Sequence, residues 1–125
     1  MKQLFSLALL AVLAGCTTIS QAAPRQDGIA GLGESTHVDG PLVTPLRLIE
    51  DSRCPINARC VWAGRVVLRV RVAGNRTMEL TLGEPQEVAD GALTLVAVAP
   101  DRIAGEGQDI APADYRFTFA FDGGY

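Results

Sequence analysis

The sequence predicts an all-β fold, a small antiparallel β-sandwich or barrel in a single disulfide-stapled domain. Short segments with strand-like patterns recur from about residue 43 onward, with turn residues between them. Few segments show a helical period. Two cysteines, Cys54 and Cys60, lie close together in a chain that begins with an export signal, and exported chains fold where disulfides form.

The export signal occupies the first residues of the chain. Lys2 precedes Leu4–Leu13, a mainly apolar run of ten residues. This run is too short for a membrane-spanning helix, which needs about twenty residues. The next residues, Leu13-Ala14-Gly15-Cys16, resemble the lipobox of bacterial lipoproteins. This resemblance implies cleavage before Cys16 and acylation of its thiol, for example with palmitate, so we expect residues 1–15 to be a lipoprotein signal peptide.

Three further observations bear on the anchor. The small residues before Ala22 and Ala23 offer an alternative site for ordinary signal cleavage. Thr17, rather than Asp, follows Cys16, and in lipoproteins of two-membrane bacteria this favours the outer membrane. With Cys16 lipidated, the two remaining cysteines form one pair. We therefore expect a protein of the cell envelope, anchored by lipid in the outer membrane and facing the periplasm.

Charge narrows the classes of partner. Removal of residues 1–15 takes away the only lysine, which leaves ten arginines against fourteen carboxylates and a net charge of −4. This net negative charge argues against nucleic-acid binding and against electrostatic binding to anionic lipid. Residues 16–35 are rich in small and polar residues and in Gly, so we expect a flexible tether there and the all-β domain in residues 36–125. The alternative is that Gly31-Leu32-Gly33 leads into a first edge strand.

The first predicted hairpin has a defined register. In residues 65–72, apolar residues alternate with mainly charged ones. This pattern places Val66, Leu68, Val70 and Val72 on the core face and Arg65, Val67, Arg69 and Arg71 on the solvent-exposed face. Residues 76–82 follow after Ala73-Gly74-Asn75. Only a three-residue loop pairs apolar residues with apolar ones, and this register predicts the pairs Val70 with Met78, Leu68 with Leu80 and Arg69 with Glu79.

Other segments complete the predicted sheet pattern. Asp90-Gly91 suits a two-residue type I′ turn that pairs Glu87-Val88 with Leu93 and Thr94. Residues 93–99 are nearly all apolar, as in a strand covered on both faces. The last strand sends four aromatic side chains to one face: Tyr115, Phe117, Phe119 and Phe121. Residues 43–50 predict another strand, at an edge or with a bulge, because of Pro45.

The two late cysteines lie in the segment Asp51–Gly64, which reads DSRCPINARCVWAG. Zinc sites need closer cysteines together with further Cys or His ligands, whereas here five residues separate Cys54 and Cys60, and His37 is the only histidine. Redox enzymes use Cys-x-x-Cys at the start of a helix. Neither pattern is present, so we expect a structural disulfide, no metal site and no cofactor.

Charged residues surround this pair of cysteines. Glu50 and Asp51 are adjacent, and neighbours on a strand point to opposite faces. We therefore expect them to pair with Arg53 and Arg59 and to anchor the loop. No nucleophile motif of hydrolases is present, so no catalytic residue is predicted. We expect Trp62 to pack over the disulfide.

A second interpretation of this loop is a protease inhibitor. A disulfide-closed loop bearing Arg59 resembles the bait for a trypsin-like protease, because closure reduces the entropy lost on binding. Arg59 directly precedes Cys60 and the ring is small, which restricts access to the peptide bond. A protease-inhibitor-like loop therefore stands as an alternative.

Two blocks of the sequence carry a family resemblance. Glu50–Pro55 and Cys60–Gly64 resemble the E-D-S-R-C-P-x₄-C-x-W-A-G core of a family of small exported bacterial proteins, many of them lipoproteins. Pro100 and the segment Ile110–Tyr115 resemble the family's entry to its last strand. The resemblance covers about residues 36–121 and implies fold and location. The family has no established activity, so it implies no catalytic residues. This chain departs from the pattern in having Arg65 where many members have Asn.

These observations predict a lipid-anchored binding or structural module whose partner is an envelope protein or a small ligand. The alternative is a small envelope enzyme with a cleft near Glu50, Asp51 and Arg53. An enzyme should show a concave pocket with convergent polar groups and perturbed pKa values. A module should show these side chains paired with each other or with loop backbone.

Overall fold

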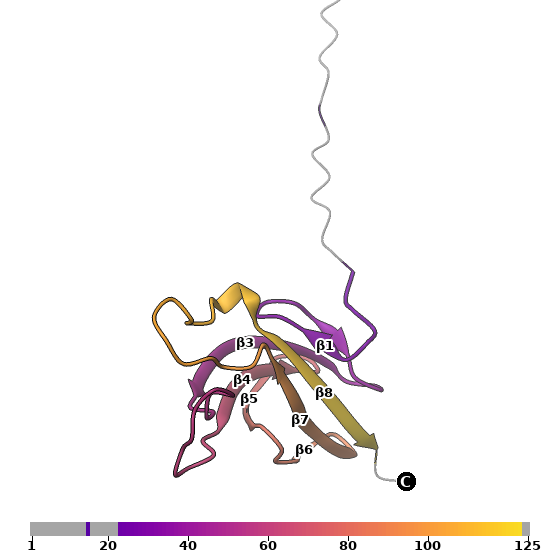
Figure 1. The fold of residues 1–125 in the computed structure, drawn as a ribbon. Helices are drawn as coiled ribbons and strands as arrows, with labels where there is room; N and C mark the ends of the chain where they lie inside the picture. Colours follow the sequence, from indigo (N-terminus) through magenta and orange to yellow (C-terminus); the bar gives the residue numbers. More distant parts are fainter. Residues whose placement is uncertain (1–14, 16–22, 124–125) are drawn as a thin grey trace, which may run out of the picture.

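Two four-stranded antiparallel sheets form the protein, which confirms the predicted all-β sandwich (Figure 1). The computed structural model describes residue 15 and residues 23–123. Cys16 and all but residue 15 of the predicted signal peptide lie outside the described residues. The strand order is β2-β3-β4-β5 in one sheet and β1-β8-β7-β6 in the other.

The strands differ widely in length. They are β1 (Ile29–Ala30), β2 (Thr36–His37), β3 (Leu42–Asp51), β4 (Val66–Val72), β5 (Arg76–Thr81), β6 (Gln86–Val88), β7 (Gly91–Ala99) and β8 (Arg116–Gly123). One turn of 3₁₀ helix, η1 (Pro112–Asp114), precedes β8. In the described part of the chain, no helix is long and apolar enough to cross a membrane.

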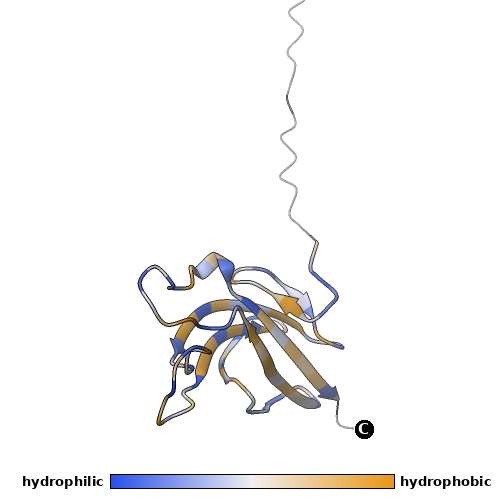
Figure 2. Ribbon diagram, in the orientation of Figure 1, coloured by the Kyte–Doolittle hydropathy of each residue, from blue (hydrophilic) through white to orange (hydrophobic). Residues whose placement is uncertain are grey.

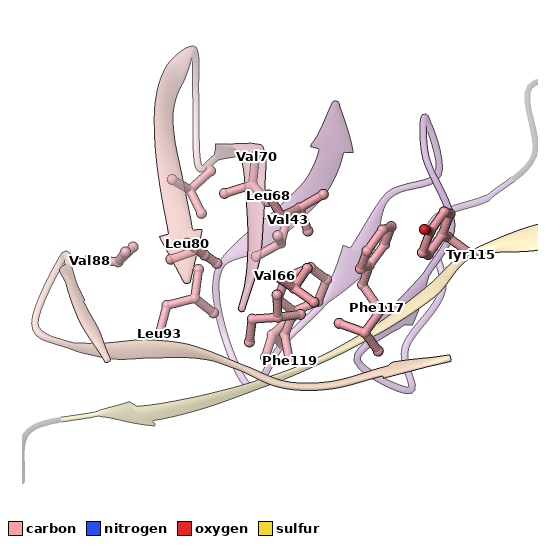
Figure 3. Close-up of a cluster of buried hydrophobic side chains, with 14 residues drawn as sticks. Val43, Val66, Leu68, Val70, Leu80, Val88, Leu93, Tyr115, Phe117 and Phe119 are labelled. Atoms are coloured by element: carbon pink, nitrogen blue, oxygen red, sulfur yellow. The ribbon is translucent and has the colours of Figure 1, made fainter. Parts of the chain in front are cut away.

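The hydrophobic core lies between the two sheets (Figure 3). Figure 2 shows the hydrophobic residues concentrated along the strands and many hydrophilic residues in the connections. The predicted inner face of β4 is confirmed, since Val66, Leu68 and Val70 are fully buried. The predicted aromatic face of the last strand, β8, is confirmed at Phe117 and Phe119, whose side chains are buried in the hydrophobic core.

The hairpin of β4 and β5 has the predicted register. Val70 pairs with Met78, Leu68 with Leu80 and Arg69 with Glu79, as a three-residue loop requires. Gly74 takes the left-handed position of that loop, with φ of 83°. The predicted solvent-exposed face has one exception. Val67, whose cross-strand partners are Glu50 and Thr81, is only 7% exposed.

The hairpin of β6 and β7 turns one residue earlier than predicted. Val88 pairs with Gly91 and Glu87 with Ala92, so the turn residues are Ala89 and Asp90. Gly91 is needed inside the strand rather than in the turn. A side chain at Gly91 would place its Cβ 2.2 Å from the carbonyl oxygen of Asp122 on β8, a distance that only glycine avoids.

Two further expectations are wrong. The strand β7 is covered on one face only, because a bulge between Leu95 and Ala97 leaves Val96 48% exposed. The folded domain also begins before residue 36, since Ile29 and Ala30 of the predicted tether pair with β8 and Ala30 is fully buried. The bulge expected from Pro45 is confirmed, since the register of β3 against β4 shifts directly after it.

Candidate functional site

The connection between β3 and β4, residues 52–65, is the candidate functional site and is called the stapled loop below. A disulfide joins Cys54 and Cys60, as predicted, with their Cα atoms 5.8 Å apart. The two chain segments stay paired beyond the strands, because the amide of Cys54 donates to the carbonyl of Ala63 at 3.2 Å. Gly64 adopts φ of 71° where a Cβ would lie 1.7 Å from the carbonyl oxygen of Ser52, so this close approach requires glycine.

A buried ion pair closes the end of the core next to this loop. Asp51, the last residue of β3, has a side chain only 5% exposed, and that of Arg53 is 15% exposed. The guanidinium of Arg53 donates to both carboxylate oxygens of Asp51, at 2.8 and 2.9 Å. The hydroxyl of Tyr115 donates to the same carboxylate at 2.8 Å. Both oxygens of Asp51 are therefore engaged.

The pKa values of this cluster follow from these contacts. Burial disfavours the charged carboxylate of Asp51, but the hydrogen bonds from Arg53 and Tyr115 outweigh it and hold the pKa below its ordinary value. Burial, together with the bond to Asp51, raises the pKa of Tyr115 to about 12. The cluster therefore holds an ionised Asp51 and a protonated phenol throughout the neutral range.

The predicted charge pairing is only partly present. Asp51 pairs with Arg53, but Glu50 pairs with Arg65, fifteen residues along the chain, rather than with Arg53 or Arg59. Glu50 lies opposite Val67, so its side chain points to the outer face while that of Asp51 points inward. Arg59 takes part in none of the ion pairs of the described residues.

One arm of the stapled loop is bonded to the connection between β7 and β8. Arg53 also donates to the carbonyls of Val98 and Pro100, each at 3.0 Å, and the guanidinium of Arg102 donates to the carbonyl of Arg53 at 2.6 Å. The amide of Ile56 donates to the carbonyl of Arg102 at 2.9 Å. We call residues 53–57 the pinned arm.

Asn57 ends the pinned arm with a two-way contact. Its side-chain nitrogen donates to the carbonyl of Ala104 at 3.1 Å, and its side-chain oxygen accepts from the amide of Ala104 at 2.8 Å. The pinned arm is thus fixed by hydrogen bonds along its length to residues 98–104. This fixation, and not the disulfide alone, sets the position of the loop.

Residues 59–63, the free arm, are not bonded to the connection between β7 and β8. Within the described chain, no hydrogen bond joins residues 59–62 to another segment. Val61 is 91% exposed and Trp62 is 82% exposed, while Ile56 on the neighbouring arm is 68% exposed. The prediction that Trp62 packs over the disulfide is therefore wrong. Val66 is the first fully buried residue of β4, so Trp62 lies four residues beyond the end of the core.

Two hollows lie near the cluster. One of about 190 Å³ is polar and is lined by Asp51, Arg102, Gln108, Asp109 and Tyr115, among others. The other, of about 280 Å³, is mainly apolar and runs between β3 and the residues before β8; Leu32, Leu46, Leu48, Ile110 and Tyr115 line part of it. Asp51 faces the polar hollow, but Arg53 and Tyr115 already occupy both of its oxygens.

Metal-ligating residues are dispersed. His37 is half-buried in β2, and the acidic residues between β7 and β8 are exposed: Asp101, Glu106, Asp109 and Asp114. Among residues 15 and 23–123, no group of three or more His, Cys, Asp or Glu side chains is placed to hold a metal ion.

Sequence reasoning missed several residues of this site. Arg102 and Asn57 connect the two loops, but nothing in their spacing signalled that contact. Arg65 is the true partner of Glu50. Tyr115 was predicted as a core aromatic, and its hydroxyl contacts the cluster. Comparisons with protein-family models, with curated proteins and with solved structures found no match.

Proposed function

We propose that this protein is a lipid-anchored binding module of the cell envelope, held in the outer membrane by lipid on Cys16 and contacting a protein partner through the stapled loop. The observation that carries the proposal is the exposure of Val61 and Trp62 on a loop that is otherwise fixed. Large apolar side chains gathered on a rigid loop are typical of interaction sites, and Trp is enriched among the residues that dominate binding energy.

The fixation of the loop supports binding in a second way. A disulfide and the hydrogen bonds of the pinned arm hold the loop in one conformation before any partner arrives. Less conformational entropy is then lost on association, so more of the contact energy appears as affinity. A loop kept only for stability would gain nothing from leaving an indole in water.

The pairing of the charged cluster supports a module over an enzyme. Asp51 donates nothing and accepts from groups of its own chain, so the ion pair anchors the loop to residues 98–100. A catalytic carboxylate needs at least one oxygen directed at substrate. The cluster therefore supports the stapled loop structurally and is not directed at a substrate.

The proposal has two tests. Mass spectrometry of the mature protein should find acylated Cys16 at the N-terminus, and an unmodified N-terminus at Ala23 or Pro24 would contradict the anchor. A photo-crosslinking residue placed at Val61 should join the protein to a discrete envelope protein in intact cells. The matched control at exposed Arg76, at the opposite end of β4, should not. Equal cross-linking from both positions would contradict the binding site.

A protease-inhibitor-like loop is the second candidate. It is favoured by one observation, that exposed Arg59 precedes a peptide bond lying inside the ring closed by Cys54 and Cys60, so cleavage would leave the two ends joined. Stoichiometric inhibition of trypsin by the folded domain, lost in Arg59→Ala, would support it. Rapid cleavage of the loop without inhibition would exclude it.

A further inference from the structure

The free arm lies far from the end of the domain that connects to Cys16. The backbone of Arg25 pairs with that of Thr36 in an isolated parallel β-bridge, and Thr36 pairs with Val43 near the start of β3. The stapled loop begins after Asp51, the last residue of β3, eight residues beyond Val43. At about 3.3 Å per residue these two positions are roughly 26 Å apart along the strand. Figure 1 shows residues 23–25 and the loop after β3 on opposite sides of the domain.

This arrangement bears on what the free arm meets. A chain that enters the domain near residue 25 from a lipidated Cys16 leaves the free arm on the side away from the entry point. The mature chain also carries a net charge of −4, which opposes close contact with anionic headgroups. Both observations favour a protein surface over the bilayer.

The charges around the loop specify that surface further. Arg53 is paired with Asp51, and Arg65 is paired with Glu50. Arg59 is exposed and stands directly before Cys60, beside the exposed Val61 and Trp62. Within the described chain it is the loop arginine without a carboxylate of its own. An apolar tip flanked by one unneutralised guanidinium has a defined complement, an apolar pocket with a carboxylate at its rim.

We propose that Val61 and Trp62 enter an apolar pocket of a partner protein and that Arg59 pairs with a carboxylate at the rim of this pocket. This inference rests on the proposed function and deepens it, because it names the chemistry of the partner surface. The guanidinium supplies orientation through a two-pronged contact, and the indole supplies most of the buried area. The pinned arm makes no contact with the partner in this arrangement; it holds the free arm in place.

The test uses the full chain with the photo-crosslinking residue at Val61 in intact cells. Arg59→Glu should lower the yield of the cross-linked protein about tenfold or more, because it places two carboxylates together. Arg59→Lys should retain part of the yield, since it keeps the charge and loses the two-pronged geometry. Arg76→Glu is the matched control, an equal change of charge at an exposed arginine at the other end of β4, and should leave the yield unchanged. An unchanged yield in Arg59→Glu would overturn the proposal.

Trp62 provides an independent readout because it is the only tryptophan of the chain. Protein-free vesicles of zwitterionic and anionic phospholipid, mixed three to one, should leave the emission of Trp62 and its quenching by acrylamide unchanged. A blue shift with these vesicles would overturn the proposal in favour of a membrane contact. Equal unfolding midpoints of the wild-type protein and Arg59→Glu establish that the variant is folded, and Arg59→Gln replaces it if they differ.

The two proposals fail in different ways. If cross-linking from Val61 persists in Arg59→Glu, the loop binds a protein but not through an ion pair, so only the further inference fails. If Val61 yields no cross-linked protein while Arg76 does, the proposed function fails as well.

Discussion

The two arms of the stapled loop are joined by one disulfide and have the same length, but they differ in their contacts with the rest of the domain. The pinned arm is bonded to residues 98–104 through backbone and side chains. The free arm exposes Val61 and Trp62, and within the described chain residues 59–62 have no hydrogen bond to another segment. The contrast teaches that the contacts that position the loop lie in one arm and the most exposed apolar side chains lie in the other. Apart from the disulfide, which involves both arms, changes in the pinned arm should therefore cost stability, and changes in the free arm should affect only the proposed binding.

Among the contacts of the stapled loop, the largest effect is expected at the buried ion pair. Arg53→Met leaves the carboxylate of Asp51 buried without its cation, so the free energy of unfolding should fall by about 3 kcal/mol. Urea denaturation followed by circular dichroism measures it. Arg65→Met is the matched control, since its partner Glu50 is more exposed, and it should cost much less. Equal losses in the two variants would contradict the anchoring role of Arg53.

The same pair gives the fold a pH dependence. Because the folded pKa of Asp51 lies below its ordinary value of 3.8, the unfolded chain binds the proton more readily. The stabilisation is fully present above that value and is lost as the pH falls below it. The difference in unfolding free energy between the wild-type protein and Asp51→Asn should therefore be largest near pH 7 and shrink below about pH 4. A difference that stays constant down to pH 2 would show that Asp51 is not held ionised.

Loss of the disulfide should have the next largest effect. In the chain-entropy model, closure of a loop of about seven residues contributes about 2.4 kcal/mol, so Cys54→Ser combined with Cys60→Ser should lower the unfolding free energy by about that amount. Urea denaturation of both proteins without reductant measures it. If the double variant also loses cross-linking from Val61, the staple fixes the free arm as well as the fold.

A smaller effect is expected at Asn57. Asn57→Ala removes both hydrogen bonds to Ala104, and because the side chain is exposed the loss should be about 1 kcal/mol. The more informative measurement is amide hydrogen exchange, which should accelerate at Ile56 and Ala104 but not at Leu68 in the core. Unchanged exchange at Ile56 would show that the other contacts suffice to hold the arm.

Much of the fold was predictable because the inward and outward faces of the strands differ in polarity. Val70 and Met78 had to face each other, and this fixed the register of β4 against β5. The turn of β6 and β7 was not predictable in the same way. Asp90-Gly91 is a good turn sequence, and the competing demand on Gly91 comes from Asp122, thirty-one residues later. Long-range close approaches of this kind leave no local signal.

The same distinction between local sequence signals and long-range contacts applies to the candidate site. The disulfide followed from the cysteine count, and strand alternation predicted that Glu50 and Asp51 point to opposite faces. The structure shows that Asp51 is the residue that points inward. The role of Arg102 depends on two loops meeting in space, which no spacing reveals. Trp62 was predicted to pack over the disulfide because it follows Cys60 closely at the start of a strand. Its exposure follows from the length of the hairpin beyond Val66, where no opposing strand remains to cover it.

The smallest expected effect on stability is at the tip of the free arm, and it is the most direct test of the contrast. Trp62→Ala should change the unfolding free energy by no more than about 0.5 kcal/mol, because the indole is 82% exposed. Phe117→Ala, at a fully buried aromatic, should cost about 4 kcal/mol. Circular dichroism must follow both, since Trp62→Ala removes the only tryptophan. Cross-linking from Val61 should nevertheless be lost in Trp62→Ala, because in the proposed contact the indole provides most of the area buried against the partner. A large loss of stability would mean that Trp62 packs against its own domain in solution. The free arm would then contribute to the stability of the domain as the pinned arm does, and a binding site would have to lie elsewhere on the surface.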